Sequence, residues 1–370
     1  MRRSSLCLLA LLLTVGCDKL ANFTQAKAPP VAEGDESAEN ESPISVYFSQ
    51  VADKPDRNRA NPKNIALACA HAIGAATRTL DVCCHEIDNK IVVEAILQAH
   101  LRGVRVRVIT ETDYLEDLGP KAFTEAGIPV ISDNRSALMH NKFAVMDGRS
   151  VWTGSFNFTE NCAYKNNNSG IYIKNGEVAE NYTAWFNWFW TEGHSTAKRR
   201  GGPTPNPKVV LPNGTVVETR LTTFDKMEEL PIKIIKGAKQ SVKFLAFSFT
   251  HKKIAAAMKE RAKAGIPIVG VFEQRNLKVS VYDDFLDEPN ITVLPDGNSF
   301  NMHHKLIIVD DSVVLAGSFN FTQSACGSND ENYVVIHANA AIAKQFVEEF
   351  NKVYKAASMK LAQKESGSRR

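Results

Sequence analysis

A twenty-residue pattern occurs twice in this chain, and it constrains the fold more than any other feature. MHNKFAVMDGRSVWTGSFNF begins at Met139, and MHHKLIIVDDSVVLAGSFNF begins at Met302. Each copy reads His, one residue, Lys, four residues, Asp, six residues, and then Gly-Ser-Phe-Asn. A hydrophobic strand that recurred by chance would not repeat these polar residues in step, so the chain contains two related halves.

The similarity between the halves extends upstream of this motif. TLDVCCHEIDNKIVVEAILQAHLRGVRVRVITE at 79–111 aligns with SVKFLAFSFTHKKIAAAMKERAKAGIPIVGVFE at 241–273. Each stretch reads as a strand, a helix, a glycine turn and a second strand, which ends in Glu111 or Glu273. The motif adds a third and a fourth strand to each half, predicted at Phe143–Met146 and Val151–Thr153, and at Leu306–Val309 and Val313–Ala316.

Each half then closes with an amphipathic helix. Its apolar positions follow helical spacing, with Tyr182, Trp185, Phe186 and Phe189 in the first half and Phe346, Phe350, Val353 and Tyr354 in the second. An aromatic stripe of this kind is typical of a core, and we interpret it as one. Strands that alternate with helices predict an α/β fold of two similar lobes, each a mixed sheet flanked by helices.

The N-terminus has the composition of an export signal. Arg2 and Arg3 precede an apolar run, Leu6–Val15, which is too short to span a bilayer and is followed by Gly16 and Cys17. A cysteine in this place resembles the bacterial lipoprotein signal, in which the cysteine is lipidated and becomes the mature N-terminus. We therefore expect residues 1–16 to be a signal peptide and the protein to be an exported lipoprotein, anchored to a membrane of the cell envelope on its periplasmic face. Plain secretory cleavage is the alternative.

Composition divides the rest of the chain. Residues 17–44 are polar and lack periodicity, which predicts a flexible tether. The Gly and Pro density around 201–214 predicts a linker between lobe 1, at 45–200, and lobe 2, at 215–360. The polar tail at 361–370 is predicted to be disordered.

Seven cysteines bear on redox state and metal binding. Beyond Cys7 and Cys17 they are Cys69, Cys83, Cys84, Cys162 and Cys326. They lack CxxC spacing, so we expect no zinc site. One or two disulfides are possible in an exported protein, although the spacing does not give their pairing, and buried free thiols are the favoured interpretation.

The polar residues of the motif have the chemistry of a phosphate site. His140 and Lys142 alternate as on a strand, so we expect both side chains on one face, with Ser155 and Asn157 beside them at the end of the fourth strand. The second half repeats the set as His303, Lys305, Ser318 and Asn320. Lysine supplies positive charge, while serine and asparagine donate hydrogen bonds to anionic oxygens. Two such sets facing one another would enclose a phosphodiester.

The doubled HxKx4Dx6GSxN motif resembles that of the phospholipase D superfamily, and the resemblance covers residues 45–360. It implies that the lobes are related by a pseudo-twofold axis and that both motifs meet at one active site, so a monomer suffices. One histidine then attacks phosphorus to give a phosphohistidine, and the other protonates the leaving alcohol and activates water. Neither a metal nor another cofactor is implied, because Lys142 and Lys305 neutralise the phosphate oxygens.

The resemblance also implies roles for residues around the histidines. The motif aspartates, Asp147 and Asp310, are expected to support the site through ion pairs rather than to react. Glu331 lies 28 residues after His303, at a position where bacterial endonuclease members carry a glutamate that orients histidine. The same count from His140 reaches Asn168.

This difference between the halves suggests a division of labour. A carboxylate neighbour raises the pKa of a histidine, whereas an amide orients the ring without charge. With Asn168 behind His140 and Glu331 behind His303, we expect His140 to be the nucleophile and His303 the general acid and base. Glu177 is an alternative partner in the first half.

The sequence leaves the substrate open. A net charge of +3 permits an anionic substrate without indicating nucleic-acid binding. We favour phospholipase D activity, which would hydrolyse a phospholipid at a membrane surface to phosphatidic acid and a free headgroup alcohol. A metal-independent endonuclease acting on DNA or RNA is the main alternative. A phosphatidyltransferase of the cardiolipin synthase kind and a lipoprotein that only binds phosphate groups are less favoured.

Overall fold

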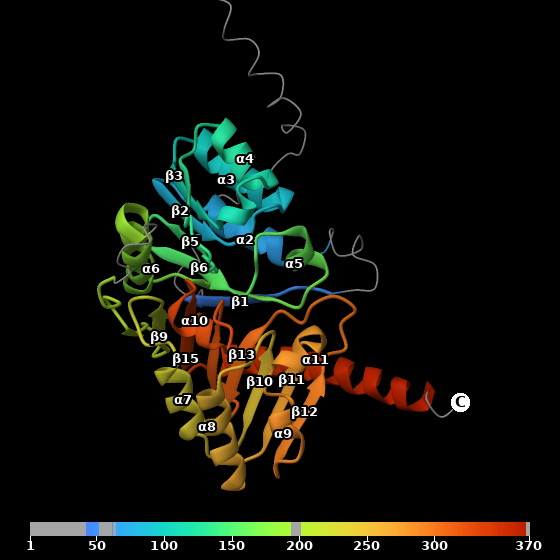
Figure 1. The fold of residues 1–370 in the computed structure, drawn as a ribbon. Coiled ribbons are helices and arrows are strands. Elements are labelled where there is room, and N and C mark those ends of the chain that lie inside the picture. The colour runs from blue at the N-terminus through green and yellow to red at the C-terminus, as the bar shows by residue number, and fades with distance from the viewer. Residues whose placement is uncertain (1–41, 52–60, 62–63, 194–200, 368–370) are drawn as a thin grey trace, which may run out of the picture. The chain divides into compact units, whose positions relative to one another are not determined.

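Two β-sheets with a common strand order form the framework of this computed structural model (Figure 1). The structure describes residues 42–51, 61, 64–193 and 201–367, which belong to one unit, Pro43–Arg370, apart from Ser42. The predicted signal peptide, Cys17 and the predicted tether up to residue 41 lie outside the described residues.

The first sheet, which defines lobe 1, runs in the order β1-β7-β6-β5-β2-β3-β4. It is mixed, because β2 pairs in parallel with β3, and β3 with β4, while the other pairs are antiparallel. The strands are β1 (Ile44–Phe48), β2 (Thr79–Cys84), β3 (Arg105–Thr110), β4 (Val130–Ser132), β5 (Lys142–Met146), β6 (Ser150–Gly154) and β7 (Ser169–Ile173).

The second sheet, which defines lobe 2, runs in the order β12-β11-β10-β13-β14-β15-β9-β8. The strands are β8 (Lys208–Val210), β9 (Val216–Leu221), β10 (Val242–Ala246), β11 (Ile268–Phe272), β12 (Ile291–Pro295), β13 (Lys305–Val309), β14 (Val313–Gly317) and β15 (Asn332–His337). Read from β9 to β12, this order repeats that of lobe 1 strand by strand. The prediction of an α/β fold with two similar lobes is therefore confirmed.

Helices cover both faces of each sheet. One face of the first sheet packs against α2, α3 and α4, and one face of the second packs against α7, α8 and α9. The other faces of both sheets share a single core with α6 and α11. The helices are α2 (Ile65–Gly74), α3 (Lys90–Leu101), α4 (Leu118–Glu125), α5 (Glu160–Tyr164), α6 (Gly176–Trp188), α7 (Glu229–Lys236), α8 (Lys252–Lys263), α9 (Asp283–Leu286), α10 (Gln323–Gly327) and α11 (Ala340–Gly367), with short helical turns η3 (Thr112–Tyr114), η4 (Phe189–Gly193) and η5 (Gln274–Val279).

The aromatic stripes predicted for the closing helices lie in this shared core. The first stripe comes from α6 and η4, and its four side chains are fully buried: Tyr182, Trp185, Phe186 and Phe189. In α11, Phe346, Phe350 and Val353 are buried, and Tyr354 packs against them. The interpretation of both stripes as core is confirmed.

Two predicted boundaries were wrong. The predicted linker, 201–214, contains β8, which pairs with β9 and extends the second sheet. An Asn213-Gly214 turn between two valine-rich segments is a hairpin signal, and Gly214 adopts a φ of 81° there. The predicted tail, 361–370, continues α11 as far as Gly367, because its Leu, Ala, Gln, Lys and Glu residues favour helix.

The glycine of each motif permits a close approach between neighbouring strands. A Cβ on Gly154, where φ is 138°, would lie 2.2 Å from the Ser169 carbonyl oxygen. A Cβ on Gly317 would lie 2.3 Å from the Asn332 carbonyl oxygen. Any larger residue would push away β7 or β15, whose first residues follow Asn168 and Glu331.

The structure also shows the state of the cysteines and whether any described helix could span a membrane. Cys69, Cys83, Cys84 and Cys162 are buried free thiols, and Cys326 is a half-buried one. Within the described ranges, no helix is both long enough and apolar enough to cross a membrane.

Candidate active site

The two motif histidines lie where the lobes exchange backbone contacts. Met139 forms a bridge with Asp330, and Met302 forms the matching bridge with Asn167. The backbone N–H of the residue after each methionine also crosses between the lobes. His140 N donates to the Asp330 oxygen at 2.9 Å, and His303 N donates to the Asn167 oxygen at 3.0 Å. This reciprocity agrees with the pseudo-twofold relation that the family resemblance implied.

The histidines do not lie within the strands in which we predicted them. We expected His140 and Lys142 within one strand, but β5 begins at Lys142 and β13 begins at Lys305. The histidines lie two residues earlier, in segments whose backbone has left its own sheet to bind the other lobe. The pairing between lobes therefore holds the histidine backbones.

Both motif lysines are buried, and each is fixed by its own histidine. Lys142 Nζ donates to the His140 carbonyl at 2.7 Å, and Lys305 Nζ donates to the His303 carbonyl at 2.9 Å. Burial lowers the pKa of Lys142, and burial together with the charge of Lys142 lowers that of Lys305. Two buried ammonium groups that repel one another favour the binding of an anion between them.

The partners of the histidines are exchanged relative to our prediction. His140 Nδ1 lies 2.9 Å from both carboxylate oxygens of Glu331, and His303 Nδ1 lies 2.8 Å from Asn168 Oδ1. Each contact therefore joins the two lobes, because the segments before β7 and β15 cross to the opposite motif. Glu177, the alternative partner, is exposed in the first turn of α6.

The exchange removes our reason for dividing the roles of the histidines. We had placed the amide behind the nucleophile and the carboxylate behind the acid. In the structure the carboxylate lies behind His140, the predicted nucleophile, and the amide lies behind His303, the predicted acid. The residues of the predicted set are brought together, but their roles need a different argument.

The motif serines hold these partners in place. Ser318 Oγ donates to Glu331 at 2.5 Å, and Ser155 Oγ donates to Asn168 Oδ1 at 3.1 Å. We predicted that Ser155, Ser318 and Asn168 bind substrate, but both serine protons are used within the protein. The Asn168 amide nitrogen donates to the carbonyls of Cys162 and Asn166, which fixes Oδ1 toward His303.

Burial keeps the two imidazoles neutral. It is the largest cause that lowers the pKa of His140 and of His303, and the charges of Lys142 and Lys305 lower both further. Burial raises the pKa of Glu331 to about 8, although Lys142, Ser318 and Lys305 oppose it. A neutral ring that donates its Nδ1 proton to an oxygen keeps a lone pair on Nε2.

The motif asparagines have side-chain oxygens without a partner in the described part of the chain. Asn157 and Asn320 each have a buried Oδ1 that has no hydrogen-bond partner among the described residues. Each lies two residues before the N-cap of a short helix, which is Thr159 for α5 and Thr322 for α10. Among the residues that the structure describes, no group of three or more His, Cys, Asp or Glu side chains is placed to hold a metal ion.

The motif aspartates fasten the start of a neighbouring strand. Asp147 accepts hydrogen bonds from the backbone of Thr77, Arg78 and Thr79, just before and at the start of β2. Burial alone would raise its pKa, but these bonds lower it to about 2. Asp310 accepts equivalent bonds from the amides that lead into β10, at Lys239, Gln240 and Ser241. The resemblance implied ion pairs, whereas these contacts come from backbone amides.

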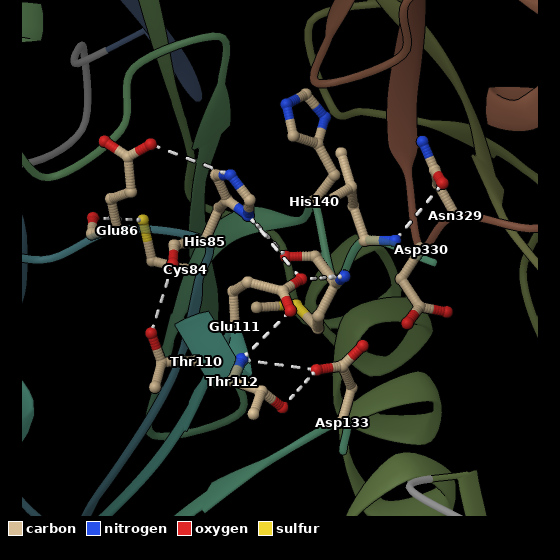
Figure 2. Close-up of polar contacts among 12 residues, drawn as sticks. Cys84, His85, Glu86, Thr110, Glu111, Thr112, Asp133, His140, Asn329 and Asp330 are labelled. Atoms are coloured by element: carbon tan, nitrogen blue, oxygen red, sulfur yellow. Dashed lines mark hydrogen bonds and ion pairs between the residues drawn. The ribbon is translucent and has the colours of Figure 1, made fainter. Parts of the chain in front are cut away.

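Sequence reasoning missed a second pair of carboxylates. Glu111 Oε2 accepts from Met139 N at 2.6 Å, and Glu273 Oε2 accepts from Met302 N at 2.7 Å (Figure 2 shows the first). Each carboxylate thus holds the residue before a motif histidine. Their matching positions at the ends of β3 and β11 were visible in the repeat alignment and could have pointed to this role.

The exchanged partners can be tested by NMR. In protein with ¹⁵N-labelled histidine, Glu331→Gln should shift the ring resonances of His140 strongly and those of His303 weakly, because only His140 contacts Glu331. Asn168→Ala should do the reverse. A strong shift of His303 in Glu331→Gln would show that each partner serves the histidine of its own lobe. Glu177→Gln is the matched control and should shift neither ring.

Comparison with known proteins agrees with this geometry. A family model described as "Cardiolipin synthase, PLD-like domain" matches residues 69–190 and 232–354. Mitochondrial cardiolipin hydrolase from Chlamydomonas reinhardtii is 37% identical over 120 residues, which are 32% of this chain and 54% of that protein. A phospholipase D from Rickettsia prowazekii is 32% identical over 113 residues, 30% of this chain and 54% of that protein. The chain therefore spans about half the length of the curated relatives that it matches.

A solved structure extends the likeness to both lobes. Phosphatidylserine synthase from Haemophilus influenzae has a TM-score of 0.62 at 13% identity, covering 79% of this chain and 84% of that one. At this identity the likeness concerns the fold alone. The family match covers both repeats, each with a complete motif, and the chain belongs to the phospholipase D superfamily.

Proposed function

We propose that the protein hydrolyses the phosphodiester bond of a phospholipid, giving phosphatidic acid and a free headgroup alcohol through a phosphohistidine intermediate. The observation that carries this proposal is the composite site, in which each lobe supplies one histidine and the residue that orients the histidine of the other. The names of the curated relatives, cardiolipin hydrolase and phospholipase D, support a lipid substrate.

The first step transfers the phosphatidyl group to the enzyme. Lys142 and Lys305, together with the side-chain N–H groups of Asn157 and Asn320, donate to the non-bridging phosphate oxygens. His140 Nε2 attacks phosphorus while the bond to the headgroup oxygen breaks, and His303 gives its Nε2 proton to that oxygen. The negative phosphate between the lysines opposes their effect on His303, so that this ring can bind the proton that it later donates.

The second step releases phosphatidic acid. Water enters from the side that the headgroup has left, and His303, now neutral, takes its proton. The new oxygen–phosphorus bond replaces the bond to His140 Nε2, so both rings return to their starting state. Because Asn168 orients His303 without charge, the ring can be neutral for this step.

Charge balance in the intermediate is our reason for assigning attack to His140. A phosphorylated imidazole that keeps its Nδ1 proton is cationic, and Glu331 is a fully buried carboxylate that contacts this proton. His303 has only a neutral amide in the same place. The opposite division, in which the carboxylate favours a protonated His140 as the acid, is the alternative that the labelling experiment below distinguishes.

The predicted lipid anchor would place this site at its substrate. We propose that Cys17 carries the anchor and that the following polar segment lets the two lobes reach the bilayer on the periplasmic side. Nucleic acid is the second substrate class that this chemistry could serve, and it forms the other arm of the substrate test.

Substrate class can be tested directly with purified protein in EDTA. Liposomes of phosphatidylglycerol, phosphatidylethanolamine or cardiolipin should release phosphatidic acid or its equivalent, and plasmid DNA and single-stranded RNA should stay intact. Cleavage of nucleic acid without lipid turnover would replace the proposed substrate. Loss of all activity in EDTA, restored only by a divalent ion, would contradict the lysine-based site.

Variants of the two lysines show whether the lobes act as one site. Lys142→Met or Lys305→Met should each lower turnover by about 100-fold or more, because each removes a charge that stabilises the same phosphate. Methionine preserves much of the buried volume, and the melting temperature of each variant checks its fold. Lys344→Met, on the exposed face of α11, is the matched control. About half the activity in either variant would mean independent sites.

The roles of the histidines can be separated with a nitrophenyl phosphodiester. This leaving group needs little protonation, so His303→Asn should still accumulate a phosphoryl group on His140. His140→Asn should show neither turnover nor labelling. Alkaline quenching followed by mass spectrometry locates the acid-labile group. A phosphoryl group on His303 in the His140→Asn protein would reverse the assignment while leaving the two-histidine mechanism intact.

A further inference from the structure

The two sides of the phosphate site differ at the ends of β2 and β10. His85 and Glu86 follow β2, and the repeat places Phe247 and Ser248 at the same positions after β10. The His85 ring lies 5.0 Å from the His140 ring, and the Phe247 ring lies 4.7 Å from the His303 ring. Lobe 1 thus has a third histidine where lobe 2 has a hydrocarbon ring.

The protonation of His85 follows from its contacts. Nδ1 lies 3.1 Å from the Met139 carbonyl oxygen and 3.9 Å from a carboxylate oxygen of Glu111 (Figure 2). Both neighbours accept hydrogen bonds, so Nδ1 carries the proton. The residue is only 7% exposed, and burial, followed by the charge of Lys142, lowers the pKa of His85 to about 3. The ring is therefore neutral, with a lone pair on Nε2.

That lone pair faces another acceptor. His85 Nε2 lies 3.7 Å from Glu86 Oε1, which is too far for a hydrogen bond, and no group of the described residues donates a hydrogen bond to this nitrogen. In Figure 2 a dashed line joins this nitrogen of the His85 ring to the Glu86 carboxylate. Two acceptors directed at one another repel unless a donor binds to both. The Tyr114 hydroxyl already donates to the Glu86 carboxylate, but His85 Nε2 has no donor among the described residues, and a ligand N–H or O–H between the two side chains would supply one.

His85 Nε2 and the Glu86 carboxylate, which form an acceptor pair, lie at the edge of the phosphate site. The charge of Lys142 acts on both His85 and Glu86, and that of Lys305 also reaches His85. The Glu86 side chain is 28% exposed, so a ligand from solvent can reach it. On the other side of His85, the Tyr114 ring packs edge-on at 5.0 Å and confines the imidazole.

We propose that His85 Nε2 and the Glu86 carboxylate together bind a hydrogen-bond donor, a hydroxyl or an ammonium group, on one alcohol of the phosphodiester substrate. The pair gives lobe 1 an acceptor site for such a donor, whereas Phe247 and Ser248 leave lobe 2 without an equivalent acceptor pair. This inference rests on the proposed phosphodiesterase activity and adds its substrate class, phosphodiesters of amino or polyhydroxy alcohols.

The charges around His85 and Glu86 also favour an amino or polyhydroxy alcohol over a nucleic acid. The negative charges of Glu86, Asp113 and Asp117 all act on the Tyr114 hydroxyl and contribute to its raised pKa, after burial. A second phosphate, as in a nucleic acid, would meet these carboxylates on its way to the pair. An ammonium or hydroxyl group meets no such repulsion.

Soluble esters test the pair without a membrane. The substrates are the 4-nitrophenyl esters of phosphoethanolamine and phosphoglycerol, with ethyl 4-nitrophenyl phosphate as the analogue without a donor. The assay measures release of both nitrophenol and the free alcohol. For the wild type, kcat/KM should be at least about tenfold higher for the phosphoethanolamine and phosphoglycerol esters than for the ethyl ester. His85→Phe, which copies lobe 2, and Glu86→Ser should each remove most of this preference and change the ethyl ester less than about twofold.

The control is His251→Asn, which copies the helix cap that Asn89 provides in lobe 1 and should keep the preference. Equal rates for all three esters in the wild type would overturn the proposal. So would an equal loss on all three in His85→Phe, because that result means that His85 only positions His140. Failure to hydrolyse liposomes would instead overturn the lipid substrate proposed above, since the soluble esters report on the pair independently.

Discussion

The active site depends on two short stretches of backbone that cross between the lobes. Met139 binds beside Asp330, and Asn167 binds beside Met302. These bridges carry Glu331 to His140 and Asn168 to His303, so neither histidine is oriented by its own half. A lobe on its own would hold an imidazole without its partner. The duplication in the sequence is therefore a requirement of the chemistry.

The crossing also brings two buried lysines near one another, which is costly without a compensating charge. The fold offers each ammonium the carbonyl of the adjacent histidine, and Glu331 is the buried carboxylate whose charge acts on both. One carboxylate cannot neutralise two cations, so a phosphodiester completes the balance. The same field keeps His140 neutral, as attack on phosphorus requires.

Much of this could be predicted from sequence, because the repeat indicates the two similar lobes, the strands of each and the motif residues, whereas the order of the strands in each sheet comes from the structure. The partners could not be assigned, since counting 28 residues from each histidine gives the right residues in the wrong lobes. Only the tertiary crossing decides that exchange. The serines were misjudged for a related reason, because their protons are used by Glu331 and Asn168. His85 passed unnoticed because its meaning depends on which ring lies beside it.

The symmetric scaffold supports an asymmetric site, with a carboxylate and a histidine on one side and an amide and a phenylalanine on the other. Both motifs together form one phosphate site. A crystal structure of the protein with vanadate tests this most directly. We expect a single vanadium centre between His140 Nε2 and His303 Nε2, with its oxygens bound by Lys142 and Lys305. Two separate anions, each bound by one motif alone, would contradict the account.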